Sequence, residues 1–212
     1  MDRANAEPFR GCTDGYGGRM AVGPGTLNGH PLPSRSTGQF GVIVFLASDV
    51  MLFASFFAAY FLLRSTNQPW PPDGVELDVA RAAIATAVLV ASSFTLVVAD
   101  RAQERGDRLT MQRWLLATSV LGGAFLANQI VEYSSLSFAA SDHPYGSVYW
   151  GLTGLHSLHV MSGLALLGLL YVRASRTPSL DEITPWANGI SLFWHLVDVV
   201  WVGVFTTIWI IR

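Results

Sequence analysis

The sequence predicts an all-α fold, an integral membrane bundle of five transmembrane helices with a flexible N-terminal tail. Of its 212 residues, 51% are apolar and only 13% are charged, whereas soluble chains carry ~25% charged residues. The apolar residues gather into runs of about 20, the length that crosses a ~30 Å hydrocarbon core at 1.5 Å per residue. Segments rich in proline and glycine separate these runs, as expected for connections between helices.

Five runs define the expected spans, which comprise residues 40–63, 79–99, 114–136, 149–172 and 190–211. The first is dense in phenylalanine, and the second carries Arg81 near its start. We expect the long side chain of Arg81 to extend toward the membrane interface. Pro178 and Pro185 lie in the stretch before the fifth span, which is interpreted as its connection to the fourth.

The first 37 residues form the predicted tail, and residues 38–212 form the predicted membrane domain. The tail is rich in glycine, proline and arginine and contains no apolar run of the kind that a signal peptide requires. We therefore interpret it as a flexible, polar, cytoplasmic segment. Its Cys12 is the only cysteine of the sequence, which excludes an intrachain disulfide.

Arginine placement predicts the orientation in the membrane. The sequence has 13 arginines and no lysine. Ten arginines fall in the tail and in residues 100–113 and 173–187, and the other three are Arg64, Arg81 and Arg212. Because cytoplasmic loops carry the excess of positive charge, the N-terminus is expected in the cytoplasm and the C-terminus outside. The net charge of −2 excludes a nucleic-acid binder, which needs a basic surface.

Several polar and ionisable residues lie inside the predicted spans, where an acid costs about 2.5–3.5 kcal/mol to insert. Asp49 lies alone in the first span. The others form three pairs with a spacing of three residues, one helical turn: Gln129 and Glu132, His156 and His159, and His195 and Asp198.

Metal or haem ligation is one possible role for these residues. A carboxylate-bridged di-iron site needs Glu-x-x-His motifs on two helices, and the sequence contains none. Three histidines at membrane depth are also too few to ligate two haems and a copper ion. The sequence therefore predicts no metal ligand and no catalytic residue.

A proton pathway and a structural network of paired polar groups are the two remaining roles. We favour the structural network for Gln129, Glu132, His156, His159, His195 and Asp198, with His195 as the expected partner of Asp198. Asp49 has no such neighbour on its own helix, so a proton- or lipid-linked role and a structural role are both open for it. A small proton-coupled transporter is a remote alternative, since neither inverted repeats nor broken helices are evident.

Four sequence signatures resemble those of haem-copper oxidase subunit III. They are residues 41–53 (GVIVFLASDVMLF), 129–133 (QIVEY) with the following SD and YGS, 154–160 (GLHSLHV) and 194–201 (WHLVDVVW). Residues 70–72 (WPP) and 86–93 (TAVLVASS) fit the same family. The resemblance runs from residue 38 to 212, and the five-span form with residues 104–107 (ERGD) is similar to actinobacterial cytochrome c oxidase subunit III.

The resemblance implies a non-redox subunit of an aerobic terminal oxidase in a bacterial plasma membrane. The complex is an oxidoreductase and translocase of the respiratory chain, which reduces oxygen to water and pumps protons. In this family subunit III stabilises the catalytic subunit I, holds structural phospholipid and sustains proton uptake. Haem and copper are expected in the partner subunits I and II. The related accessory protein of nitric oxide reductase and subunit III of a quinol oxidase are the alternatives.

The sequence departs from the family pattern in two respects. The family commonly has glutamate at the position of Asp49, and aspartate is one methylene shorter. Seven-helix members also have two further N-terminal helices, which frame a lipid-holding cleft. A cleft of that kind would need a partner subunit to complete it here.

Overall fold

The computed structural model describes residues 26–27, 30–31, 37–75 and 77–211. Cys12, the tail arginines and Arg212 lie outside these residues, so the expectations that concern them stay predictions. The chain divides into two units, Met1–Arg35 and Ser36–Arg212. In the first unit, strands β1 (Thr26–Leu27) and β2 (His30–Pro31) pair antiparallel.

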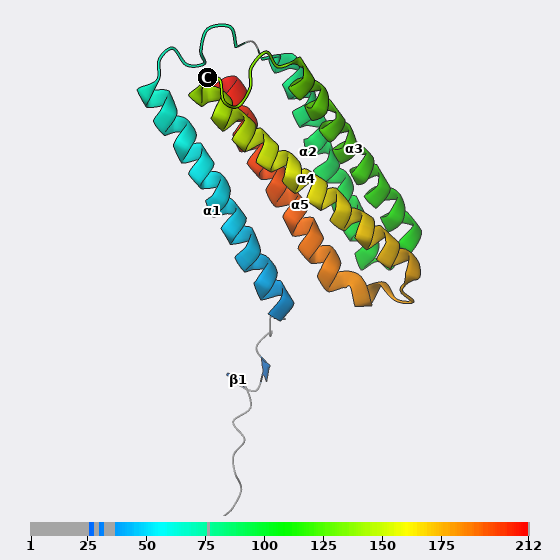
Figure 1. Ribbon diagram of the computed structural model, residues 1–212. Helices are drawn as coiled ribbons and strands as arrows, with labels where there is room; N and C mark the ends of the chain where they lie inside the picture. The colour runs from blue at the N-terminus through cyan, green and yellow to red at the C-terminus, as the bar shows by residue number, and fades with distance from the viewer. Residues whose placement is uncertain (1–25, 28–29, 32–36, 76, 212) are drawn as a thin grey trace, which may run out of the picture. The chain divides into compact units, whose positions relative to one another are not determined.

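Five long helices make up the second unit and confirm the predicted fold class (Figure 1). They are α1 (Thr37–Thr66), α2 (Val79–Glu104), α3 (Arg108–Ser135), α4 (Pro144–Arg176) and α5 (Thr184–Phe205). A 3₁₀ turn, η1 (Leu180–Ile183), precedes α5, and a π-helical turn, η2 (Thr206–Ile210), continues it. Each of the first four helices is long and apolar enough to span a membrane, and so is the segment Leu180–Ile210, which joins η1, α5 and η2.

Polar caps determine where α2 and α3 begin, and α3 starts before the apolar run that predicted it. Asp78 begins α2 by accepting a hydrogen bond from the backbone N–H of Arg81, and Asp107 begins α3 by accepting one from Thr110. Hydrogen bonds from Thr110 also lower the pKa of Asp107 below its usual range. Between α2 and α3, Gly106 adopts a φ of 72°, a left-handed conformation that glycine reaches without strain.

The fifth helix starts at Thr184 instead of residue 190, so this predicted boundary is wrong. The sequence-based boundary takes Pro185 as part of the connection between the fourth and fifth spans. Proline is however well tolerated in the first turn of a helix, where its missing N–H would have no partner in any case. The true connection is residues 177–183, most of which form η1.

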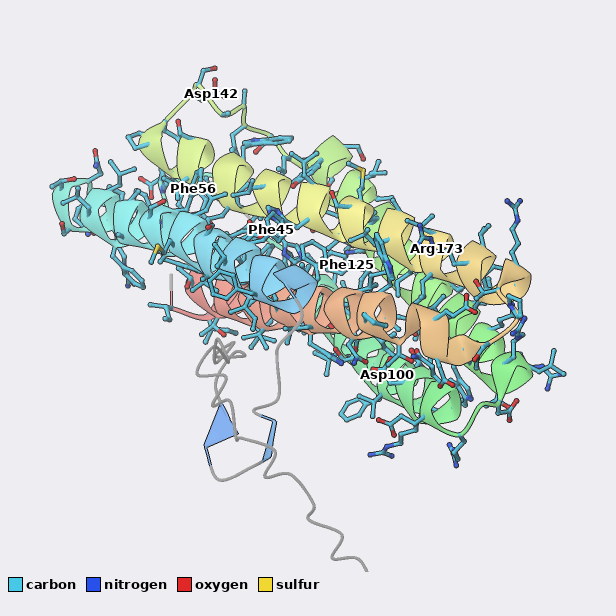
Figure 2. All side chains as sticks on the ribbon, turned by 90° about the horizontal axis from the view of Figure 1, so that it is seen from below. Phe45, Phe56, Asp100, Phe125, Asp142 and Arg173 are labelled. Atoms are coloured by element: carbon cyan, nitrogen blue, oxygen red, sulfur yellow. The ribbon has the colours of Figure 1, made fainter. Side chains whose placement is uncertain are left out.

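Helices α2 to α5 form a four-helix arrangement, in which α2 contacts α3 and α5, and α4 contacts the same two helices. Helix α1 lies against α4 and α5 (Figure 1). Phe56 and Phe57 of α1 pack where Gly151 of α4 and Gly203 of α5 leave room (Figure 2 labels Phe56). Only 17% of the spanning window of α1 is buried, against 50% for α5. Helix α1 therefore has the largest share of its surface available to lipid or other chains.

Trp194 of α5 fixes the packing of the central helices. Its side chain is 1% exposed and lies against Gly122 of α3 and Gly163 of α4, where an added Cβ would come within 2.6 and 2.8 Å of the ring. The indole N–H donates to the Ser92 hydroxyl of α2 at 3.0 Å. One tryptophan thus sets the approach of three neighbouring helices.

Candidate functional site: polar clusters at the helix interfaces

Asp49 faces a histidine on another helix. Asp49 is 8% exposed, and its carboxylate oxygen Oδ1 lies 3.6 Å from Nε2 of His159 on α4. This distance is an ion-pair contact and is longer than a direct hydrogen bond. The other ring nitrogen of His159, Nδ1, lies 2.8 Å from the carbonyl oxygen of Leu155. Sequence spacing did not predict this pairing, because Asp49 and His159 lie on different helices.

The contact with Leu155 fixes where the protons of His159 can be. A carbonyl oxygen only accepts hydrogen bonds, so Nδ1 must carry a proton. Nε2 is then the ring nitrogen that faces the Asp49 carboxyl group. The contact gives each of the two side chains an ionisable partner inside the bundle, where an isolated charge is costly.

Ser93 connects the next pair of predicted residues. Its hydroxyl on α2 donates to Oδ2 of Asp198 and lies 3.0 Å from Nδ1 of His195. Because Ser93 has one hydroxyl proton and gives it to Asp198, Nδ1 of His195 is the donor in the second bond. The expectation that His195 is the partner of Asp198 is corrected accordingly: the bonded partner is Ser93. One of two adjacent serines in an apolar run gives no sequence signal for this role.

Glu132 is paired with Arg81, which sequence reasoning assigned to the membrane interface. Nη1 of Arg81 lies 3.7 Å from Oε2 of Glu132. Nε donates to Oδ1 of Asn128 at 2.9 Å, and Nη2 donates to its backbone carbonyl at 3.3 Å. The guanidinium thus joins α2 to α3. Gln129 is buried on the same helix, and its Nε2 has no hydrogen-bond partner among the described residues.

His156 and His159 do not form a shared site, although they lie one turn apart. His159 faces α1, whereas His156 is fully buried between the rings of Phe125 and Trp201, at centroid distances of 5.8 and 4.7 Å. Neither ring nitrogen of His156 has a hydrogen-bond partner within the described part of the chain. Among all residues that the structure describes, no group of three or more His, Cys, Asp or Glu side chains could hold a metal ion.

A further acid lies at the α2–α5 interface and was not predicted. Asp100, labelled in Figure 2, accepts a hydrogen bond of 2.6 Å from the Ser191 hydroxyl. The ionisable groups are thus distributed over three helix pairs, α1–α4, α2–α5 and α2–α3. Each of these groups except His156 contacts a polar or charged group on a neighbouring helix. These contacts join the helices to one another.

Comparison with known proteins gives the family. The family model described as cytochrome c oxidase subunit III matches residues 18–211. A probable cytochrome c oxidase subunit 3 of Nocardia farcinica is 40% identical over 187 residues, which cover 86% of this chain and 92% of the relative. The subunit 3 of Corynebacterium diphtheriae is 36% identical, with 81% of this chain and 87% of the relative covered.

The similarity extends beyond the actinobacteria. The cytochrome c oxidase subunit 3 of Thermostichus vulcanus is 35% identical over 175 residues, which cover 81% of this chain and 86% of the relative. These matches confirm the resemblance that the four sequence signatures indicated. The match to the family model includes the five helices in full and all of the polar residues described above. The chain therefore belongs to the cytochrome c oxidase subunit III family, whose members are subunits of an oxidoreductase complex.

Proposed function

We propose that this chain carries no redox centre and that it stabilises the catalytic subunit I of its oxidase, holds phospholipid and sustains proton uptake. Haem and copper would lie in subunits I and II. The observation that supports this proposal best is the pairing of Asp49 with His159 between α1 and α4. It places an acid beside an ionisable partner on the helix whose spanning segment has the smallest buried share.

The remaining polar groups have a structural role in this proposal. Glu132 with Arg81, and Asp198 with Ser93 and His195, join helices by contacts inside the bundle. Polar contacts between membrane helices are typically worth about 0.6 kcal/mol and at most ~1.7 kcal/mol. Such contacts specify which helix faces align. Gln129 and His156 complete the buried polar set.

The proposed location is a bacterial plasma membrane, with the N-terminus in the cytoplasm and the C-terminus outside. Among the described residues, six arginines lie at the end of the bundle that carries the α2–α3 and α4–α5 connections (Figure 1). Arg64 and Arg81 lie toward the opposite end. The excess of arginine supports a cytoplasmic position for the first end.

Affinity purification in mild detergent tests the proposed function. A tagged copy of this chain should co-purify with oxidase subunits I and II, and haem and copper should be found in those subunits. After the chain is separated in folded form, metal analysis should find neither metal bound to it. Co-purification with the catalytic chain of a nitric oxide reductase, or stoichiometric metal in the separated chain, would contradict the proposal.

A further inference from the structure

A groove on the surface of the bundle runs between α2 and α3 from the start of α2. Its cavity volume is about 330 Å³. The polar end is lined by Asp78, Arg81 and Asn128, and the walls below it include Ile84, Val88 and Ala124. Ile84 is 68% exposed, so the groove opens away from the core of the bundle.

The groove changes from polar to apolar with depth in the membrane. Asp78 caps α2, and the spanning segment begins at Val79. Ile84 and Val88 lie three and seven residues beyond Arg81, which is roughly 4.5 and 10 Å deeper at 1.5 Å per residue. Charged groups therefore lie at the level of lipid headgroups, and apolar side chains lie at the level of acyl chains.

Arg81 retains donors for a ligand at this polar end. A guanidinium has five N–H donors, and the two bonds to Asn128 use Nε and one N–H of Nη2. The second hydrogen of Nη2 and the two hydrogens of Nη1 take no part in the bonds to Asn128. Nη1 lies 3.7 Å from Oε2 of Glu132. The Arg81 side chain is 29% exposed, which leaves it accessible from the groove.

The local charges select the kind of headgroup. Arg81 contributes one positive charge, whereas Asp78 and Glu132 each contribute a negative charge. The Asp78 carboxylate uses Oδ1 to cap the helix and is exposed. A headgroup with only a negative charge would meet Asp78 without compensation. A headgroup with a phosphate and a cation matches Arg81 and Asp78 together.

We propose that this groove binds an aminophospholipid, with the phosphate on Arg81 and the primary ammonium on Asp78. One acyl chain lies along Ile84, Val88 and Ala124. A primary ammonium is favoured over a quaternary one, because only the former has N–H bonds to donate to the carboxylate. This site specifies which lipid the chain holds, and it rests on the proposed lipid-holding function. If no aminophospholipid binds here, co-purification with the catalytic subunits is unaffected. Failure of the lipid site and failure of the proposed function are therefore distinguishable.

Lipid retention by the full chain tests this site. The chain is reconstituted in bilayers that contain phosphatidylethanolamine, phosphatidylcholine and phosphatidylglycerol in equal amounts, and native mass spectrometry identifies the lipids retained after extraction. Phosphatidylethanolamine should be enriched about two- to fivefold over each of the others, the range expected for a partly exposed charge pair.

Two substitutions test the placement. Ala124→Phe fills the apolar groove from an exposed position, and Asp78→Asn removes the charge while keeping a side chain that caps helices well. Both should abolish the enrichment. Ala127→Phe is the matched control, because Ala127 is exposed on the same helix and does not line the groove. Arg81 itself is kept, since its loss would leave Glu132 buried without a cation.

Three results would overturn the proposal. The first is equal retention of the three lipids, and the second is enrichment of phosphatidylglycerol above phosphatidylethanolamine. The third is wild-type enrichment in the Ala124→Phe protein. Folding of each variant is verified by its thermal unfolding, so that loss of lipid is not confused with loss of structure.

Discussion

At the scale of single residues, the three buried acids among the described residues each contact a group on a neighbouring helix. Asp49 has Nε2 of His159, Asp198 has the hydroxyl of Ser93, and Glu132 has the guanidinium of Arg81. An unpartnered charge inside the membrane would be costly. Only the Asp49 contact joins two side chains that can each gain or lose a proton, since arginine stays protonated and serine is a neutral hydroxyl. This difference separates the expected roles of the three acids.

Asp49→Asn tests whether the carboxyl group of Asp49 takes part in proton exchange. Asparagine keeps the size of the side chain but removes the group that can exchange a proton with His159. We expect slower proton uptake or fewer turnovers before inactivation, with an unchanged haem spectrum. Stopped-flow proton uptake and turnover counts of the assembled oxidase measure this effect.

Asp49→Glu is the control for that experiment. It keeps a carboxyl group that can exchange a proton, on a side chain one methylene longer. This variant should retain uptake and durability. Unchanged uptake and lifetime in Asp49→Asn would show that Asp49 is purely structural.

Ser93→Ala tests the bridge between α2 and α5. The substitution removes the partner of both Asp198 and His195, so the free energy of unfolding should fall by up to ~1.7 kcal/mol. It should fall more than in His195→Ala, which leaves the Ser93–Asp198 bond in place. Unfolding of the purified chain in mixed detergent micelles gives these values.

Ser162→Ala is the matched control for the bridge. The Ser162 hydroxyl bonds only to Leu158 on its own helix, and the residue is exposed. Equal stability of Ser93→Ala and Ser162→Ala would mean that the bridge contributes nothing to the bundle.

At the scale of helices, glycines on α4 decide which neighbours can approach. Gly163 accommodates the ring of Trp194, whereas Gly168 has open space around it. Sequence analysis can note that a helix is rich in small residues. It cannot tell which of them lies under a neighbouring ring, because that depends on the rotation of both helices.

Gly163→Ala should destabilise the chain relative to Gly168→Ala. A Cβ at Gly163 would lie 2.8 Å from Trp194, and overpacking of this kind costs about 1–3 kcal/mol. Both variants share the gain in helix propensity from replacing glycine, so their difference in unfolding free energy isolates the steric clash. A Gly163→Ala protein as stable as the Gly168→Ala protein would mean that Trp194 moves aside without cost.

The helix boundaries show where periodicity and hydropathy stop being informative. With Asp107 as its cap, α3 begins at Arg108, before the apolar run that predicted it, and α2 continues past residue 99 to Glu104. Pro185 lies in the first turn of α5. Hydropathy detects the part of a helix that lies in hydrocarbon. The turns at either end are stabilised by hydrogen bonds and caps, which a count of apolar residues does not register.

At the scale of the whole molecule, thiol labelling tests the proposed orientation. In a background with Cys12→Ser, Asp73→Cys lies in the α1–α2 connection and Asp181→Cys lies in η1. With the N-terminus in the cytoplasm, a membrane-impermeant reagent should label Asp73→Cys in intact cells and Asp181→Cys only after permeabilisation. The opposite pattern would reverse the assignment.

The sequence by itself determined the fold class with its five long apolar helices and the family, because these follow from long apolar runs and from motifs read along one chain. It also showed which polar residues share a helical turn. Only the tertiary structure decided their partners: His159 for Asp49, Ser93 for Asp198 and Arg81 for Glu132. Spacing along a helix places residues on its own faces. A partner on another helix depends on relative rotation and depth, which side-chain packing sets.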